Sequence, residues 1–151
     1  MNEYFKNTTP AQRAKHRAIR KGLANQGYFA WGKAPIGLDK LKNADTGYLP
    51  LLSVNQTGLA IGHIFYAIEA GELTSYEEAQ EYLNRYLGEN GNQHPPLTRE
   101  QMRKVLHDPR YMGVRRNQGE QMDLQFHKCK PPVPAERFKV VQVILARWDW
   151  Q

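Results

Sequence analysis

Residues Leu97 to Gly113 read LTREQMRKVLHDPRYMG, and they predict a short helix with one apolar and one basic side. Thr98 is followed three residues later by Gln101, which is the spacing of a capping box, so we expect the helix to begin there. Pro109 should end it, because the residue before a proline is pushed out of the α region.

The two sides of this predicted helix suggest different roles. Met102, Val105 and Leu106 share one side at the i, i+3, i+4 spacing that faces a core. The other side carries the charged residues Arg99, Glu100, Arg103 and Lys104. Arginine can bond guanine bidentately, lysine reaches phosphates or base edges, and glutamine can contact adenine, so the helix suits the major groove of DNA. An ordinary surface helix with solvated charges has the same pattern, and both interpretations stay open at this point.

Composition favours one cytoplasmic domain. The chain has 151 residues, of which 40% are hydrophobic, and this suits a single domain with a sizeable core. No apolar run approaches the roughly 18 residues of a membrane span, and residues 1–6 lack the apolar centre of a signal peptide. Cys129 is the single cysteine, which excludes an intrachain disulfide and a Cys-x-x-Cys zinc site.

The net charge of +6 is unevenly distributed along the chain. Residues 1–50 carry nine Lys/Arg and three Asp/Glu, residues 51–96 carry one and six, and residues 97–151 carry eleven and six. Two basic segments therefore flank an acidic middle. A polyanionic partner that touches both basic segments would explain this pattern, and so would a basic protein whose charge only keeps it soluble.

A basic helix is predicted near the N-terminus. Thr9 and Pro10 form a helix start, and we expect the helix to run to about Asn25 and end at Gly27. Its expected inward positions are small or weakly apolar: Ala11, Ala14, Ala18, Ile19 and Leu23. Its outward positions are polar and mostly basic: Arg13, Lys15, His16, Arg17, Arg20 and Lys21. Such a helix has little apolar surface to dock it, so it either lies on DNA phosphates or completes an element elsewhere.

The remaining segments predict an α+β fold that is mainly helical. Apolar periodicity predicts further helices at 57–70, 76–87 and 135–150. The second of these and the helix that begins at Thr98 form a helix-turn-helix-like pair. Short strands are expected at 28–31, at 48–54, and in a hairpin that pairs 111–115 with 122–126. We expect them to form one small antiparallel sheet around Phe29, Tyr48, Tyr111 and Leu124. A glycine-proline loop carrying Lys33 follows the first strand, and residues 39–46 should form a polar turn.

No catalytic or cofactor pattern emerges from the residues. The five histidines, His16, His63, His94, His107 and His127, show no metal-ligand spacing. No Gly-rich loop ends in Gly-Lys-Ser/Thr, and Ser75 is best explained as a helix cap. A Ser-His-Asp site forms only in space, and nothing in the sequence favours one. We therefore expect no cofactor, no metal and no small-molecule substrate.

Several motifs follow one another in a recognisable order. Gly32, Pro35 and Gly37 fit a Gly-x-x-x-Gly-x-x-Pro-x-Gly-Tyr loop, with Leu38 where tyrosine is usual. A helix ending in Gly71 comes next, and then a helix with Ala79, Leu83 and Asn84 in place. Residues 105–113 fit v..iL.nP.Y.G, with Asp108 where asparagine is commoner, and Phe138 with Val141 begins a late helix.

This ordered set, which covers roughly Gly22 to Leu145, resembles the recombinase domain of the large serine recombinases, the integrases of phages and mobile elements. The resemblance implies a DNA-binding domain that follows a catalytic domain and precedes a zinc ribbon. Nothing before Asn25 resembles the catalytic domain with its serine nucleophile, and a ribbon needs cysteine pairs that this chain lacks. The chain thus resembles an excised middle domain, or a truncated product, and by itself it should not be an enzyme. Residues 1–25 would be the tail of the linker helix, and residues 26–151 the DNA-binding domain.

The resemblance and the charge pattern predict sequence-specific binding of double-stranded DNA, at one half of a recombination attachment site, by a monomer. The candidate DNA-binding residues are Arg13, Arg17, Arg20, Lys21, Lys33, Arg99, Gln101, Arg103, Lys104, Arg110, Arg115 and Arg116. Two alternatives remain. One is an unrelated helix-turn-helix regulator, and the other is a protein-interaction domain that docks a partner through the end carrying Trp148 and Trp150.

Overall fold

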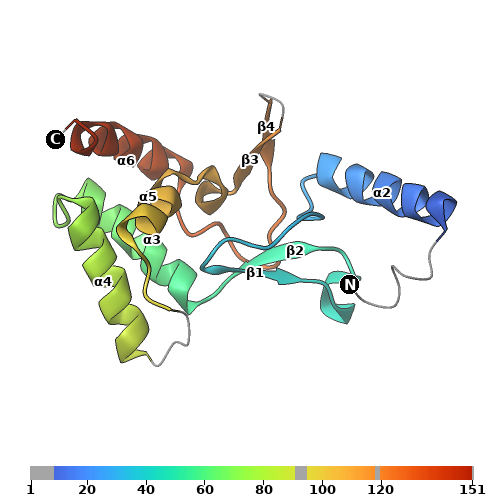
Figure 1. Ribbon diagram of the computed structural model, residues 1–151, viewed down its shortest axis with the longest axis horizontal. Helices are drawn as coiled ribbons and strands as arrows, with labels where there is room; N and C mark the ends of the chain where they lie inside the picture. The colour runs from blue at the N-terminus through green and yellow to red at the C-terminus, as the bar shows by residue number, and fades with distance from the viewer. Residues whose placement is uncertain (1–8, 91–94, 118–119, 151) are drawn as a thin grey trace.

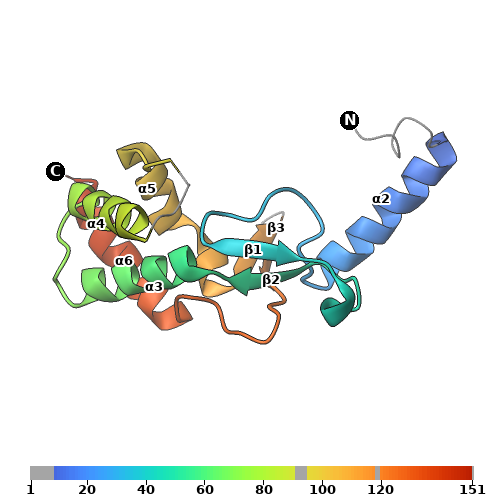
Figure 2. The ribbon, with the colours of Figure 1, turned by 90° about the horizontal axis from the view of Figure 1, so that it is seen from below.

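Four helices pack together at one end of an elongated molecule, and another helix extends from the opposite end (Figure 1, Figure 2). The computed structural model describes residues 9–90, 95–117 and 120–150. The packed helices are α3 (Gln56–Glu69), α4 (Tyr76–Glu89), α5 (Arg99–His107) and α6 (Ala135–Trp148). The extended helix is α2 (Pro10–Asn25). Residues of the expected loop 89–96 and of the expected hairpin turn at Gly119 lie partly outside the described residues.

The centre of the core is α3. Its stripe of Ile61, Ile64, Phe65 and Ile68 is fully or almost fully buried, as the apolar spacing predicted. The Phe65 ring stacks on the Phe138 ring of α6, with 5.6 Å between the ring centroids. Each such fully buried apolar side chain stabilises the fold by about 1.5–3 kcal/mol. The predicted helices 57–70, 76–87 and 135–150 are therefore confirmed, with ends that differ by one or two residues.

The strands form two separate antiparallel pairs instead of the single sheet that we expected. The strands are β1 (Leu38–Leu41), β2 (Leu51–Val54), β3 (Val114–Asn117) and β4 (Glu120–Asp123). In the first pair Leu38 lies opposite Val54, and in the second Val114 lies opposite Asp123. A single parallel bridge between Leu52 and Phe126 joins the β2 region to the segment after β4. Two short 3-10 helices, η1 (Ala44–Thr46) and η2 (Pro109–Met112), complete the described elements.

The strand expected at residues 28–31 is absent, and β1 occupies part of the expected polar turn at 39–46. The Phe29 N–H donates to the Pro50 carbonyl at 3.0 Å, so this segment does begin to pair with the chain before β2. Pro50 has no N–H to return a bond, which prevents a regular ladder there. Pairing with β2 passes instead to residues 38–41, which have no proline opposite them.

Gly37, the last glycine of the glycine-proline loop, lies where the loop packs closely against α3. Its φ is +92°, and a Cβ at this position would lie 2.8 Å from the Gly58 Cα. The Gly37 carbonyl accepts a hydrogen bond from the Asn55 N–H at 3.1 Å. The loop before β1 therefore lies directly against the first turn of α3, at a distance that only glycine allows.

The prediction of the α2 boundaries is confirmed, but the prediction of its buried side is wrong. The Thr9 and Gln12 side chains and backbones form a reciprocal capping box, and the helix ends before Gly27. Of the five expected inward positions Leu23 is half-buried, while Ala11, Ala14, Ala18 and Ile19 are exposed, and Ala24 is the buried residue of this helix. Most of α2 extends away from the body, so its weakly apolar side finds no core among the described residues (Figure 1). No described helix is long and apolar enough to cross a membrane.

Candidate nucleic-acid interface

The capping box predicted for α5 is present. Thr98 Oγ1 accepts from the Gln101 N–H at 3.1 Å, and Gln101 Oε1 accepts from the Thr98 N–H at 2.9 Å. The apolar side is buried through Met102, Val105 and Leu106, and the charged residues Arg99, Glu100, Arg103 and Lys104 are exposed. The predicted sidedness of α5 is therefore confirmed. Because the Gln101 amide oxygen already accepts from the backbone, a bidentate contact to adenine would compete with the cap.

The angle at which the chain enters α5 is fixed by α4. Asn84 donates from Nδ2 to the Leu97 carbonyl at 2.9 Å, and its Oδ1 accepts from the Leu97 N–H at 2.8 Å. Gln80 Nε2 donates to the same carbonyl at 3.1 Å. Leu97 is 3% exposed, so its backbone polar groups depend on these side chains for partners. Asn84 and Gln80 of α4 therefore hold the residue from which the chain enters α5.

The C-terminal end of α5 turns sharply at Asp108. The Asp108 backbone is extended, and its Oδ1 accepts from the Arg110 N–H at 3.0 Å, which begins η2. The Arg110 guanidinium also binds the Asp108 carboxylate, with 2.7 Å between Nη2 and Oδ2. This hydrogen bond raises the pKa of Arg110. Arg110, a predicted DNA contact, therefore serves first to brace the turn.

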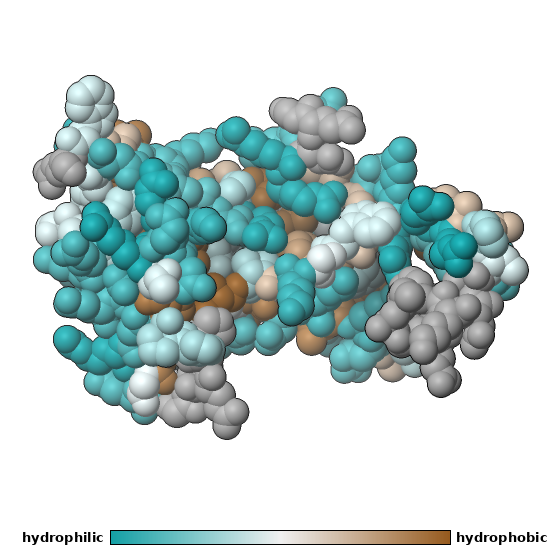
Figure 3. Space-filling model, viewed as in Figure 1, coloured by the Kyte–Doolittle hydropathy of each residue, from teal (hydrophilic) through white to brown (hydrophobic). Residues whose placement is uncertain are grey.

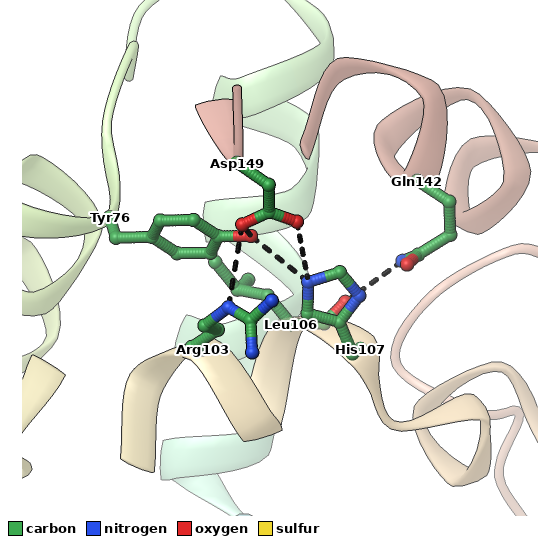
Figure 4. Close-up of polar contacts among 6 residues, drawn as sticks. All are labelled: Tyr76, Arg103, Leu106, His107, Gln142 and Asp149. Atoms are coloured by element: carbon green, nitrogen blue, oxygen red, sulfur yellow. Dashed lines mark hydrogen bonds and ion pairs between the residues drawn. The ribbon is translucent and has the colours of Figure 1, made fainter. Parts of the chain in front are cut away.

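A polar cluster surrounds the outer side of α5 (Figure 4). The Tyr76 hydroxyl, from the start of α4, donates to Asp149 Oδ1 at 3.0 Å and lies 2.9 Å from His107 Nε2. Arg103 Nε donates to the same Asp149 oxygen at 3.4 Å. Asp149 follows the last residue of α6, so the cluster joins α4, α5 and α6. The Trp148 ring meets the Tyr76 ring edge-on at 5.2 Å and covers one side of it.

The ionisation of this cluster reflects its hydrogen bonds. Burial and the hydrogen bond to Asp149 raise the pKa of Tyr76 to about 12. Burial of the Asp149 carboxyl acts to raise its pKa, but hydrogen bonds from Tyr76 and Arg103 outweigh burial and lower it. The hydrogen bond to Asp149 also raises the pKa of Arg103. At neutral pH the cluster therefore holds a carboxylate beside a guanidinium on the exposed side of α5.

The second basic group lies on α2. Arg13, Arg17 and Lys21 are exposed, and the Arg20 guanidinium lies 5.5 Å from the centroid of the Trp31 ring. Trp31 is 42% exposed, beside Arg13, His16 and Arg17. Sequence reasoning placed Trp31 in a strand and gave it no role. The basic group on α2 therefore includes an exposed aromatic ring among its cationic side chains.

The loop of residues 31–37 connects the two basic groups. Its Trp31 end contacts α2, and its Pro35–Ile36 end lines a cleft with Gln101 and Lys104 of α5. Lys33, a predicted contact, is exposed between these ends. The Tyr111 hydroxyl donates to the Ile36 carbonyl at 2.6 Å and holds the loop against η2. In Figure 2, α5, this loop and the N-terminal half of α2 lie along the same upper edge of the molecule.

The two arginines of β3 differ in their surroundings, because Arg115 bonds within the fold and Arg116 is exposed. Arg115 of β3 donates from Nη2 to the Ala24 carbonyl at 3.3 Å, so it ties the hairpin to the last turn of α2. Arg116 is exposed.

Most of the predicted contact residues fall into two groups. One group lies on α5 and contains Arg99, Gln101, Arg103 and Lys104. The other lies on α2, near the far end of the molecule, and contains Arg13, Arg17, Arg20 and Lys21. Figure 3 shows that the face turned to the viewer in Figure 1 is largely hydrophilic, with apolar patches in hollows between polar side chains.

Sequence reasoning missed two further residues of this region. Asp149 lies 46 positions from Arg103 in the chain, and no local sequence pattern predicts their contact. Asn84 was recognised as part of a motif, but its hydrogen bonds to Leu97 were not foreseen. Among the described residues, no group of three or more His, Cys, Asp or Glu side chains could hold a metal ion.

Comparison with known proteins supports the fold. No family model matches the chain, and no curated protein matches its sequence. An LSR–DNA complex, that of a large serine recombinase, aligns with a TM-score of 0.57 at 15% identity and covers 89% of this chain and 38% of that one. A structure from work on the sequence requirements of the Listeria innocua prophage attP site aligns with a TM-score of 0.55 at 16% identity, covering 88% and 52%.

The TM-scores of 0.57 and 0.55 show a shared fold with both structures. The chain spans about two fifths of the length of the first of these proteins and about half of the second. The predicted resemblance to the recombinase domain is therefore confirmed at the level of the fold, and the mainly helical α+β class with it.

Proposed function

We propose that this chain is the DNA-binding middle domain of a large serine recombinase, and that it binds one half of an attachment site in double-stranded DNA. Residues 1–25 would be the end of the linker helix and residues 26–151 the DNA-binding domain. The observation that carries the proposal is α5, a helix whose exposed side is mainly basic and whose entry is held by hydrogen bonds from Asn84 and Gln80 of α4. The fold shared with part of a large serine recombinase in complex with DNA supports it.

In this proposal α5 enters the major groove and α2 follows the backbone. Arg99, Arg103 and Lys104 supply base-edge or phosphate contacts, and Arg13, Arg17, Arg20 and Lys21 hold phosphates or reach the minor groove. Lys33 and Arg116 add backbone contacts from the loop and the hairpin. Arg110 and Arg115 act mainly within the fold, since Asp108 and the Ala24 carbonyl already engage them.

The chain would bind without cutting or joining DNA, as a monomer in the cytoplasm and without a cofactor. Strand exchange would belong to the parent recombinase, which would assemble through its other domains.

The test is a salt titration of binding to two duplexes. One is a half-site selected by the protein from random sequences, and the other is a scrambled duplex of the same composition. We expect steep salt dependence on both, because each phosphate contact adds about 0.9 to the slope of log K against log salt. We expect tighter binding to the selected half-site. Absence of binding to either duplex at low salt would overturn the proposal.

Single variants then assign the contacts. If Arg103 bonds a guanine, Arg103→Ala should cost about 1–3 kcal/mol at one base pair and little elsewhere. Lys104→Ala should weaken binding to all duplexes and lower the salt slope by about 1. Lys139→Ala in α6 removes the same charge from an exposed position outside the proposed interface, and it serves as the control.

Exposed apolar side chains on α6 and just after its end support a second candidate function, a protein-interaction domain. Val140 is 46% exposed, Val143 is 61% exposed and Trp150 is 90% exposed. Of the two tryptophans expected to dock a partner, Trp148 is half-buried with its ring against Tyr76, and Trp150 is the more exposed. Failure to bind DNA at low salt, together with loss of a protein partner in Trp150→Ala, would favour this candidate.

A further inference from the structure

Asp149 brings a negative charge next to Arg103 on the exposed side of α5, where Glu100 of α5 and Glu77 of α4, 3.3 Å from Arg99, are also acidic. The Asp149 carboxylate lies 3.4 Å from Arg103 Nε, and the Arg103 side chain is 48% exposed. A helix that only gripped phosphates would gain nothing from an anion at this position, because the anion repels phosphate. The carboxylate therefore requires a different explanation.

The carboxylate is held firmly in place. The Tyr76 hydroxyl donates to Asp149 Oδ1, and His107 Nε2 lies against the same hydroxyl at 2.9 Å (Figure 4). Gln142 Nε2 donates to the Leu106 carbonyl at 2.8 Å and fixes α6 against the end of α5. Asp149 thus has a defined position relative to the axis of α5, set by two other helices.

The contact constrains Arg103 in a way that suits a base edge. Asp149 binds Nε, so the two terminal nitrogens of the guanidinium remain outside this contact. A guanidinium held at Nε has fewer rotamers to lose when its terminal nitrogens meet the O6 and N7 acceptors of a guanine. The neutral base edge tolerates the nearby carboxylate better than a phosphate does.

We propose that Asp149 is a positioning residue that, together with Tyr76, directs Arg103 toward a base edge and weakens the binding of α5 to DNA of any other sequence. This inference rests on the proposed function and deepens it. It adds a residue from the end of α6 to the determinants of specificity, although that residue need not touch DNA.

The test compares Asp149→Asn with Glu136→Gln, which removes the same charge from an exposed position at the other end of α6. Each variant is titrated with the selected half-site, with the half-site changed at the base pair that Arg103→Ala identifies, and with the scrambled duplex. We expect Asp149→Asn to bind the scrambled duplex about twofold to fivefold more tightly than Glu136→Gln does. We expect its discrimination at the Arg103 base pair to fall from about tenfold to about threefold or less.

Two further variants separate position from charge. Tyr76→Phe keeps the Asp149 charge and removes a hydrogen-bond donor, so it should lower discrimination without tightening binding to the scrambled duplex. In an Arg103→Ala background, Asp149→Asn should leave discrimination at that base pair unchanged, since the pair acts as a unit. Far-ultraviolet circular dichroism and thermal melts confirm that each variant is folded.

The outcomes are distinct. If the native chain binds the half-site with discrimination and Asp149→Asn behaves like Glu136→Gln, the positioning role is wrong and the proposed function stands. If the native chain binds no duplex at low salt, both proposals are overturned. Looser binding of Asp149→Asn to every duplex would also contradict the positioning role.

Discussion

Asn84 holds the backbone of Leu97 from both directions, because its amide donates to the Leu97 carbonyl and accepts from the Leu97 N–H. The two bonds are 2.9 and 2.8 Å long, and the residue that they hold is buried. Together with Gln80, which also donates to the Leu97 carbonyl, Asn84 therefore sets the point at which the chain enters α5.

We expect Asn84→Ala to lower the free energy of unfolding by about 1–3 kcal/mol, because it leaves the buried Leu97 N–H without its partner and the Leu97 carbonyl with the Gln80 bond alone. Chemical denaturation measures this change. Asn90→Ala is the control, because Asn90 caps the end of α4, is exposed, and donates from its amide to the Tyr86 carbonyl of that helix. Equal effects of the two substitutions would show that the Asn84 bonds contribute little.

Two glycines should respond to alanine in opposite directions. Gly37→Ala combines a φ of +92° with a Cβ 2.8 Å from the Gly58 Cα, so we expect it to destabilise the fold by at least about 1–3 kcal/mol. Gly22→Ala places its Cβ in open space within α2 and should stabilise that helix by about 0.5–1 kcal/mol. Thermal melts report the first effect and helical ellipticity the second. A neutral Gly37→Ala would contradict the close approach of the loop to α3.

Stability at high pH should depend on Tyr76. Its pKa is about 12 in the folded chain, above the ordinary value of 10.0, because burial and Asp149 disfavour the tyrosinate. A raised pKa contributes stability that is present below pH 10 and is lost as the pH rises toward 12. The native chain should therefore lose more unfolding free energy than Tyr76→Phe between these pH values. Denaturation at several pH values tests this. If the unfolding free energies of the native chain and of Tyr76→Phe fell in parallel with pH, the ionisation of Tyr76 would not contribute to stability.

Arg115 should control how firmly α2 is attached. Arg115→Ala removes the hydrogen bond from β3 to the Ala24 carbonyl, so amide hydrogens in the last turn of α2 should exchange with solvent faster. Arg116→Ala is the matched control, because Arg116 follows it on the same strand and is exposed. Hydrogen exchange followed by mass spectrometry resolves the two. Unchanged exchange in Arg115→Ala would mean that other contacts carry the joint.

The elements that were predicted correctly are those whose cause is local. Thr98 and Gln101 lie within one turn and cap each other, and the spacing of Met102, Val105 and Leu106 fixes the buried side of α5 without knowledge of its partner. The same holds for the α3 stripe and for the start of α2 at Thr9.

The predictions that were wrong concern segments whose structure depends on a distant part of the chain. The strand expected at residues 28–31 failed because Pro50, far along the chain, cannot return a hydrogen bond. Ala11, Ala14, Ala18 and Ile19 were expected to be buried from their spacing, but most of α2 has no described neighbour to cover them. The contacts of Asp149 with Tyr76 and Arg103 could not be predicted from the sequence, because they depend on how three helices pack together.

The attachment of α2 through its last turn makes the helix a lever. Its 16 residues span about 24 Å at 1.5 Å per residue. Rotation by about 10° at the joint near Ala24 would move the far end by about 4 Å, close to the 3.4 Å spacing of successive base pairs. On DNA bound by both α5 and α2, the few bonds around Ala24 and Gly27 would therefore set the number of base pairs between the two contacts.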